Sequence, residues 1–184
     1  MPDQHTPRLE HNSGIESTED LMSKSKLLLL DIGCGDRKHD AAIGIDTRRT
    51  KAVDIIADAA KLPFKQQVFD HVYSSHTIEH FSHHEIEEVV KEWARVLKQN
   101  GIIEIRCPWL RLRALLFFLR PTQKNVENIY GGQDYAGNYH KCGFSFGLLK
   151  NLMESVGIID VRRVLEKYKG IPFVSDLHVI GVKK

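Results

Sequence analysis

A short apolar segment that leads directly into a glycine turn constrains the fold of this chain more than any other feature. The segment, Lys26–Ile32 (KLLLLDI), is followed by Gly33, Cys34 and Gly35. A continuous apolar run of this length, bounded by a turn, is typical of a strand buried in a parallel sheet. Glycines at the exit of such a strand let a ligand approach the backbone where a Cβ would collide. The pattern predicts a buried strand with a ligand site at its end, and a tight turn without a ligand is the alternative.

After this strand, segments of strand type alternate with segments of helical spacing. Strands are predicted at residues 42–46, 53–57, 69–74, 102–107, 158–165 and 177–182, and helices at residues 83–98, 109–119 and 144–156. Residues 121–142 have a loop-like composition. This alternation predicts an α/β fold with a doubly wound, mostly parallel sheet and helices on both faces. Ligands bind such sheets at the carboxyl ends of the strands.

The length and charge of the chain limit its organisation and its partners. At 184 residues, 42% of them hydrophobic, the chain is long enough for one domain with a buried core. Residues 1–20 are polar, and residues 1–22 are predicted to form a flexible tail, which leaves residues 23–184 as the single domain. A net charge of +2 gives no electrostatic footprint for duplex nucleic acid.

The cysteines and the apolar segments bear on the compartment. Cys34, Cys107 and Cys142 are odd in number and widely spaced, which fits neither a disulfide framework nor a zinc site with paired ligands. Residues 1–20 show no secretory signal, and the longest apolar stretch, Trp109–Leu119, is too short to span a membrane. We therefore expect a cytoplasmic protein without a transmembrane segment.

Two aspartates follow the predicted second and third strands. Asp46 comes after Ile45, where a carboxylate can accept hydrogen bonds from both hydroxyls of a ribose. Asp58 comes after Ala57, where it can accept a hydrogen bond from an adenine amino group. Each aspartate alone is also compatible with an ordinary loop or cap position. Together with the glycine turn, they predict a nucleoside site without phosphates.

A nicotinamide dinucleotide is disfavoured at this site. Its fingerprint needs a third glycine where this chain has Lys38, and an acidic ribose ligand about 20 residues further on. Asp46 comes earlier than that spacing requires, whereas Asp54 lies nearer to it and keeps this alternative open.

These segments resemble, in order, the motifs of class I S-adenosylmethionine-dependent methyltransferases, particularly the small-molecule, type 11-like branch. The matching segments lie between Lys26 and Pro108 and read LLLLDIGCGD, GID, DAAKLPF, FDHVYSSHTIEHF and EWARVLKQNGIIEI. A subgroup of predicted methyltransferases is also similar at residues 131–133 (GGQ) and 140–144 (HKCGF). The resemblance implies a Rossmann-like, seven-stranded sheet whose last strand is antiparallel, with S-adenosylmethionine as the cofactor.

The resemblance also implies roles for residues at the strand ends. Asp31 would lie near the ammonium group of the cofactor, Asp46 would bind its ribose, and Asp58 would contact its adenine edge. The other residues implied in cofactor binding are Gly33, Cys34, Gly35, Thr47, Ala59, Ser74 and Ser75.

Histidines follow the fourth predicted strand and are candidates for a general base, because histidine titrates near neutral pH. The family motif implies that His76 and His80 line the active site. His80 and His84 have a spacing that could bind a metal within one helix. However, Ser82 is predicted to cap that helix, with Glu85 completing a capping box. The cap would place His80 before the helix, so no metal site is predicted.

The polar loop after the fifth strand belongs to a predicted acceptor-side insertion at about residues 109–143 and is predicted to shape the acceptor pocket, because long loops often carry function. We interpret His140 as an acceptor-side base and Gln133 and Tyr139 as substrate ligands, with a solvated surface loop as the alternative. The preceding segment, Trp109–Arg120 (WLRLRALLFFLR), fits a helix packed on the sheet. It also fits a lid over an apolar substrate, or a docking surface for a lipid-linked acceptor or an anionic membrane.

The resemblance therefore implies methyl transfer to a small-molecule, sugar or lipid-linked acceptor. A catalytically inactive binding module or partner subunit with the same fold is the alternative. Two features support this alternative. Arg37 stands where the first motif of the family usually has a third glycine, and only ten residues separate Gly35 from Asp46, too few for a full crossover helix. A nucleic-acid amino methyltransferase is disfavoured, because residues 74–76 (SSH) replace the Asn/Asp-Pro-Pro-aromatic segment of that class. No oligomeric state is predicted.

Overall fold

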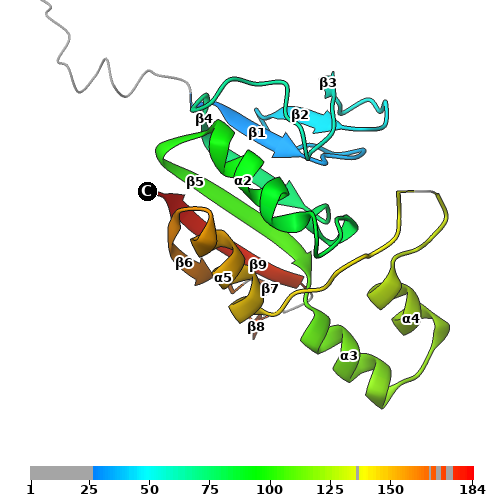
Figure 1. Cartoon of the computed structure of the whole chain (residues 1–184). Coiled ribbons are helices and arrows are strands. Elements are labelled where there is room, and N and C mark those ends of the chain that lie inside the picture. The colour runs from blue at the N-terminus through cyan, green and yellow to red at the C-terminus, as the bar shows by residue number, and fades with distance from the viewer. Residues whose placement is uncertain (1–26, 136, 166, 169–170, 173–175) are drawn as a thin grey trace, which may run out of the picture.

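A mixed, seven-stranded sheet forms the centre of the molecule. The computed structural model describes residues 27–135, 137–165, 167–168, 171–172 and 176–184. The predicted tail at residues 1–22 and the first residue of the first predicted strand, Lys26, lie outside the described residues. The strand order is β3-β2-β1-β4-β5-β9-β6 (Figure 1). The strands are β1 (Leu29–Ile32), β2 (Ile43–Asp46), β3 (Ile55–Ile56), β4 (Phe69–Ser75), β5 (Leu97–Pro108), β6 (Ile158–Arg163) and β9 (Asp176–Lys183).

The strand directions bring the predicted site residues to one edge of the sheet. β3, β2, β1, β4 and β5 are parallel, and β9 pairs antiparallel with both β5 and β6. This arrangement confirms the doubly wound, mostly parallel sheet with an antiparallel last strand. In register, Ile32 of β1 lies beside Ile45 of β2 and Ser74 of β4. The segments that follow these three strands therefore lie together.

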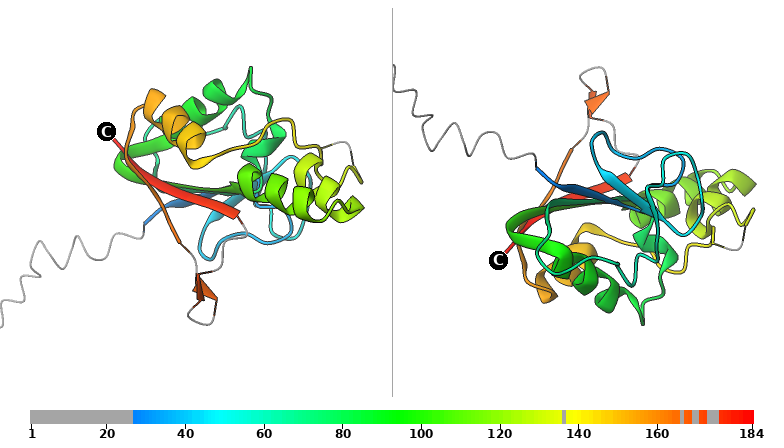
Figure 2. Two further views of the ribbon diagram at one scale, coloured as in Figure 1. Left: turned by 90° about the horizontal axis from the view of Figure 1, so that it is seen from below. Right: turned by 90° about the horizontal axis from the view of Figure 1, so that it is seen from above.

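Helices α2 (Ile86–Val96) and α5 (Phe146–Ser155) lie side by side on one face of the sheet (Figures 1 and 2). The predicted apolar stripe of α2 faces the sheet, and its buried residues are Ile86, Val89, Val90, Trp93, Ala94 and Val96. The side chain of Trp93 is fully buried, and its indole N–H donates a hydrogen bond to the carbonyl of Ala59 at 2.9 Å. The core is thus continuous from this helix to the loop after β3.

Helix α2 is shorter at both ends than the predicted helix over residues 83–98. It begins at Ile86 because residues 83–85 form a turn, in which the Glu85 carboxylate accepts hydrogen bonds from the backbone N–H and hydroxyl of Ser82. It ends at Val96 because Leu97 already pairs with Phe69 of β4 as the first residue of β5. The predicted reciprocal capping box is therefore only half formed, and Glu85 takes the N-cap position.

The segment after β5 differs most from prediction. Helix α3 (Leu110–Leu119) was expected, but helix α4 (Gln123–Tyr130) lies within the segment predicted as loop. Thr122 caps α4 by accepting a hydrogen bond from the backbone N–H of Asn125. No residue of α4 is buried, and its apolar residues, Val126, Ile129 and Tyr130, form only a short stripe within a polar segment. Strands β7 (Lys167–Tyr168) and β8 (Ile171–Pro172) form a separate pair that the sequence did not predict.

The first crossover, residues 33–42, contains turns and no helix, as its length requires. Within the residues described, no helix has the length and hydropathy needed to cross a membrane.

Candidate active site

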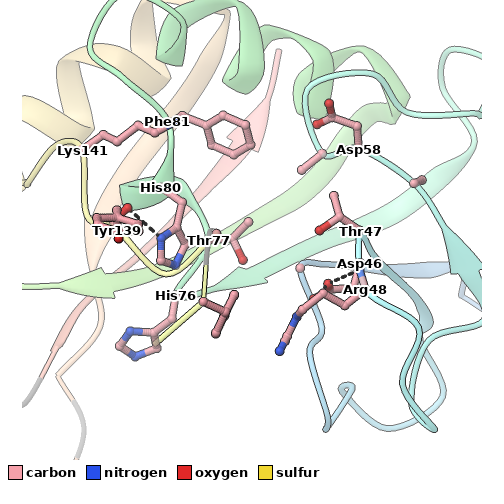
Figure 3. A pocket seen from close by; sticks show the side chains of 15 residues that line it. Asp46, Thr47, Arg48, Asp58, His76, Thr77, His80, Phe81, Tyr139 and Lys141 are labelled. Carbon is pink, nitrogen blue, oxygen red and sulfur yellow. Dashed lines mark hydrogen bonds and ion pairs between the residues drawn. The ribbon is translucent and has the colours of Figure 1, made fainter. Parts of the chain in front are cut away.

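A cavity of about 870 Å³ opens at the carboxyl ends of the parallel strands. One wall carries the side chains of Asp46 and Asp58, and the opposite wall carries those of His76, His80 and Tyr139 (Figure 3). The volume lies in the range of sites that bind small molecules. The two walls come from different parts of the chain: the first follows β2 and β3, and the second follows β4 and α4.

A smaller cavity, of about 290 Å³, lies beside the glycine turn. Asp31, Cys34 and Ser75 line it, and Gly33 lines both cavities. The two spaces therefore adjoin at Gly33, where an elongated ligand can extend from one into the other.

The backbone at the glycine turn requires glycine. Gly33 and Gly35 have φ angles of +70° and +57°, a region that is unfavourable for residues with a Cβ. A Cβ at Gly33 would also collide with the side chain of Thr77. The backbone N–H groups of Gly33 and Cys34 donate to the carbonyl of Ile45 at 2.8 and 3.0 Å, which ties the turn to β2.

The Asp46 carboxylate is held rigidly at the cavity wall. Its Oδ2 accepts a hydrogen bond from the backbone N–H of Gly35 at 3.0 Å, and its Oδ1 accepts one from that of Arg48 at 2.8 Å. The Arg48 guanidinium lies 4.9 Å from the centre of the Tyr135 ring. The Nε of Arg48 also donates to Oδ1, at 3.4 Å, so Oδ2 is the oxygen that can still accept a hydrogen bond from a ligand hydroxyl.

Burial changes the titration of two groups at the smaller cavity. Asp31 is 2% exposed, and burial raises its pKa, although its Oδ2 accepts a hydrogen bond from the backbone N–H of His39 at 2.6 Å. Burial, assisted by the nearby carboxylates of Asp31 and Asp46, raises the pKa of the Cys34 thiol to about 11. Cys34 is therefore protonated at neutral pH and is not a nucleophile there.

Most of the cofactor-side residues predicted from the sequence line one of the two cavities. The larger cavity includes Gly33, Asp46, Thr47, Asp58 and Ala59, and the smaller one includes Asp31, Gly33, Cys34 and Ser75. Gly35 and Ser74 line neither. Gly35 instead supports Asp46, and the buried Ser74 hydroxyl donates to the carbonyl of Ile32 at 3.1 Å.

The acceptor-side candidates are only partly brought together. His76, His80 and Tyr139 line the larger cavity, whereas His140 and Gln133 do not. The carboxylates of Asp176 and Glu79 lie 3.2 and 3.3 Å from the ring nitrogens of His76 and raise its pKa to about 9, so His76 is protonated at neutral pH and cannot accept a proton.

His140 lies behind the cavity wall, with its Nδ1 3.1 Å from the carbonyl oxygen of Ile129. Burial lowers the pKa of His140, which keeps its imidazole neutral.

Sequence reasoning missed one buried group and several cavity residues. Glu79 is 1% exposed, although it lies between two candidate histidines in the segment HTIEH. Its burial depends on residues 141 and 142, whose backbone N–H groups donate to the Glu79 carbonyl at 2.8 and 3.3 Å. No local pattern signals that contact. The missed cavity residues include Arg48, Thr77, Tyr135 and Lys141.

Comparison with known proteins adds a family and a fold. The family profile of the type 11 methyltransferase domain matches residues 38–105. An S-adenosylmethionine-dependent methyltransferase from Methanosarcina mazei superposes with a TM-score of 0.61 at 19% identity, over 86% of this chain and 92% of its own. One from Archaeoglobus fulgidus superposes with a TM-score of 0.59 at 18% identity, over 87% of each chain.

A third solved structure is a Haloferax volcanii methyltransferase in complex with the methyltransferase activator Trm112. Its TM-score is 0.55 at 13% identity, over 85% of this chain and 81% of the other. At these identities the solved structures show the fold alone. No curated protein is significantly similar in sequence to this chain.

The chemistry of the cavity fits the cofactor of this family. Asp46 offers a carboxylate suited to a ribose hydroxyl, Asp58 offers one suited to an amino group, and Gly33 leaves the backbone open beside both cavities. The family profile over residues 38–105 and the sheet topology support a class I S-adenosylmethionine-dependent methyltransferase of the type 11 branch, with S-adenosylmethionine as its cofactor.

Proposed function

We propose that this enzyme methylates a small-molecule, sugar or lipid-linked acceptor that binds against His80 and Tyr139. The observation that carries the proposal is the division of the cavity of about 870 Å³ into two chemically different walls. The wall with Asp46 and Asp58 suits a nucleoside, and the wall with His80 and Tyr139 offers a ring nitrogen and a phenol to a polar acceptor (Figure 3).

On the cofactor side, we assign Asp46 to the ribose and Asp58 to the adenine edge. The smaller cavity then receives the methionine part, with Asp31 and Ser75 in its wall. Bound there, the cofactor supplies a methyl group that its sulfonium already activates. The protein must mainly hold the acceptor close and aligned, an effect that can contribute about 7–11 kcal/mol.

On the acceptor side, His80 is the histidine whose position suits contact with the substrate. Its Nδ1 lies 3.1 Å from the carbonyl oxygen of Tyr139, so Nδ1 carries the proton and Nε2 keeps its lone pair. His76 is protonated and His140 lies outside the cavity lining, so we assign them supporting positions. A general base, where the acceptor needs one, adds about 10²–10⁴-fold to the rate.

The apolar surface of α3 supports a lipid-linked acceptor within this class. Leu115, Phe118 and Leu119 are 51%, 81% and 64% exposed, and the nearby side chains of Arg111 and Arg120 are also exposed. Apolar side chains beside exposed arginines suit peripheral contact with an anionic membrane. Helix α3 begins directly after β5 and lies beyond the carboxyl-end edge of the sheet (Figure 1).

We also propose a cytoplasmic location. All three cysteines of the chain are free, which suits a reducing compartment.

The test of the proposed function is a transfer assay with an acceptor panel. The purified enzyme is incubated with S-adenosylmethionine labelled in the methyl group and with sugars, small amines and phenols, or polyprenyl-linked sugars. We expect label in at least one class of acceptor, with S-adenosylhomocysteine formed in equal amount. Calorimetric titration with S-adenosylmethionine, and with NADH as the control, runs in parallel.

The alternative, an inactive binding module or partner subunit, predicts a different pair of results. It predicts S-adenosylmethionine binding without product from any acceptor class, and the loop in place of the first crossover helix is its structural support. A third arm adds vesicles of phosphatidylglycerol or of phosphatidylcholine. Co-sedimentation with the anionic vesicles, reduced in Phe118→Ser, would place the acceptor at a membrane, and its absence favours an acceptor in solution.

A further inference from the structure

A buried glutamate lies between histidines at the back of the acceptor wall. Glu79 belongs to the short 3-10 helix η1 (Ile78–His80), and His140 approaches it from the segment after α4. Both carboxylate oxygens of Glu79 are buried without a hydrogen-bond partner. A buried carboxylate without partners is costly, because the charge has lost its hydration. The site therefore lacks a group that would satisfy these oxygens.

Two of the histidines around Glu79, His80 and His140, are oriented as ligands. The Nδ1 of His80 lies 3.1 Å from the carbonyl oxygen of Tyr139, and the Nδ1 of His140 lies 3.1 Å from that of Ile129. Each ring therefore donates its Nδ1 proton to a backbone carbonyl and keeps the lone pair on Nε2. Histidines that bind metals are oriented in this way, with the second ring nitrogen bonded to a carbonyl or a carboxylate.

The distances within this cluster suit a single cation. One ligand atom from each of Glu79, His80 and His140 lies within 4.8 Å of the others. The Nε2 of His140 is 3.9 Å from Oε1 of Glu79, and the rings of His80 and His140 lie edge to face with their centres 5.3 Å apart. Small side-chain movements would bring all three atoms to one ion.

We propose that Glu79, His80 and His140 form a binding site for a divalent first-row transition metal, such as Zn²⁺. Two imidazoles and one carboxylate are a common ligand set for such ions, whereas Mg²⁺ and Ca²⁺ prefer oxygen ligands alone. Three protein ligands leave a position open to another molecule. Because His80 also lines the large cavity, that position lies at the acceptor wall, and His80 would then hold the metal and not act as a base.

This set differs from the His80–His84 pair considered in the sequence. His84 is exposed, and its ring stacks against that of His83 with the centres 3.8 Å apart. The proposed ligand set instead joins the adjacent residues Glu79 and His80 to His140, which is distant in sequence.

The competing account of the cluster is a simple ion pair. The Nδ1 of His76 lies 3.3 Å from Oε1 of Glu79, but the Nε2 of the same ring lies 3.2 Å from Asp176. Arg113 also pairs with Asp176, at 2.9 Å. The His76 cation is thus shared between two carboxylates, and Oε2 of Glu79 still has no partner. A metal ion would neutralise the carboxylate and satisfy both oxygens.

Metal binding is measured directly, without an acceptor. Untagged protein is stripped with a chelator and titrated with Co²⁺ while the visible absorption of the bound ion is recorded. Zn²⁺ affinity is then obtained by competition. We expect one equivalent to bind, Zn²⁺ to displace Co²⁺, and Mg²⁺ in excess not to displace it. Glu79→Gln and His140→Gln should each weaken binding at least about tenfold.

The control variants are His83→Gln and His84→Gln, which remove the exposed neighbouring histidines and should leave the affinity unchanged. His140→Gln keeps the test valid if Glu79→Gln does not fold, which circular dichroism shows. The proposal is overturned if no Co²⁺ binds, or if the control variants lose binding while His140→Gln keeps it. Because the readout is the metal alone, its failure says nothing against methyl transfer.

Discussion

Helices α2 and α3 are of nearly equal length, yet they relate to the core in opposite ways. Of the eleven residues of α2, six are buried, whereas none of the ten residues of α3 is. Helix α2 closes one face of the sheet beside the cofactor site. Helix α3 is held by a few polar and aromatic contacts, among them the Arg113–Asp176 ion pair and the Arg163 guanidinium 4.1 Å from the centre of the Trp109 ring.

This difference implies that the stability of the fold and the choice of acceptor depend on different segments of the chain. We call residues 27–108, which carry the proposed cofactor site, the cofactor half. This half is built around the core, so changes there should lower the free energy of unfolding. We call residues 109–143 the acceptor half. This half contributes little to the core, so changes in α3 should alter acceptor binding and leave the stability nearly unchanged. An acceptor segment of this kind can vary without unfolding the enzyme.

The largest expected effect is the loss of the Trp93 side chain. Trp93→Ala should lower the free energy of unfolding by about 3–5 kcal/mol, because it leaves a cavity in the core and removes the hydrogen bond to Ala59. Phe118→Ala, in the exposed α3, should change it by less than about 0.5 kcal/mol. Urea unfolding measures both. Similar losses for the two variants would show that α3 belongs to the folded core.

The second effect is on cofactor affinity. Asp46→Ala should weaken S-adenosylmethionine binding about 10- to 150-fold, since hydrogen bonds to a charged group contribute about 1.5–3 kcal/mol. The matched control is Asp54→Ala, because Asp54 lines neither cavity and instead pairs with Lys38 at 2.6 Å. Calorimetry should show nearly unchanged binding in the control. The reverse pattern, together with NADH binding, would move the ribose site to Asp54.

The third effect concerns the glycine turn. Gly33→Ala should cost about 1–3 kcal/mol of stability, because φ is +70° and the new Cβ meets Thr77. Gly147→Ala, in α5, should be neutral or stabilising by up to about 1 kcal/mol, because nothing lies within 4 Å of its Cβ. Thermal unfolding compares the two. The double variant Gly33→Ala/Thr77→Ala should cost less than the sum of the single variants.

The smallest effect concerns a surface ion pair of the cofactor half. Hydrogen bonds from Lys98 and from the backbone N–H of Leu28 lower the pKa of Asp70 below its usual 3.8. The stability that the ionised Asp70 carboxylate contributes is therefore complete above pH 3.8 and is lost as the pH falls through the lowered pKa. Asp70→Asn should cost less than about 1 kcal/mol at pH 7, because solvent screens the pair.

Urea unfolding at pH 7 and at pH 3 checks this prediction. The difference between Asp70→Asn and the parent should shrink at the lower pH. A difference that stayed constant would mean that Asp70 acts through something other than its charge. A cost as large as that of Trp93→Ala would overturn the view that burial, and not surface charge, separates the two halves.

The cofactor half could be predicted because its signals are local. A continuous apolar run marks β1, the glycines mark its exit, Asp46 ends β2, and Asp58 comes two residues after β3. Parallel pairing then aligns the strand ends, so residues that follow successive strands meet at one edge of the sheet. The fold class and most cofactor-side residues that line the cavities therefore follow from the sequence.

The acceptor half depended on the path of the chain. Helix α4 is short and buries no residue, so the apolar positions Val126, Ile129 and Tyr130 mark it only weakly within a polar segment. Glu79 and His140 meet only because residues 141 and 142 hydrogen bond to the Glu79 carbonyl. Local patterns report which surface of an element is buried, whereas the meeting of distant loops is decided by tertiary packing. The sequence by itself determined the sheet and the cofactor edge, and only the tertiary structure assembled the buried cluster behind the acceptor wall.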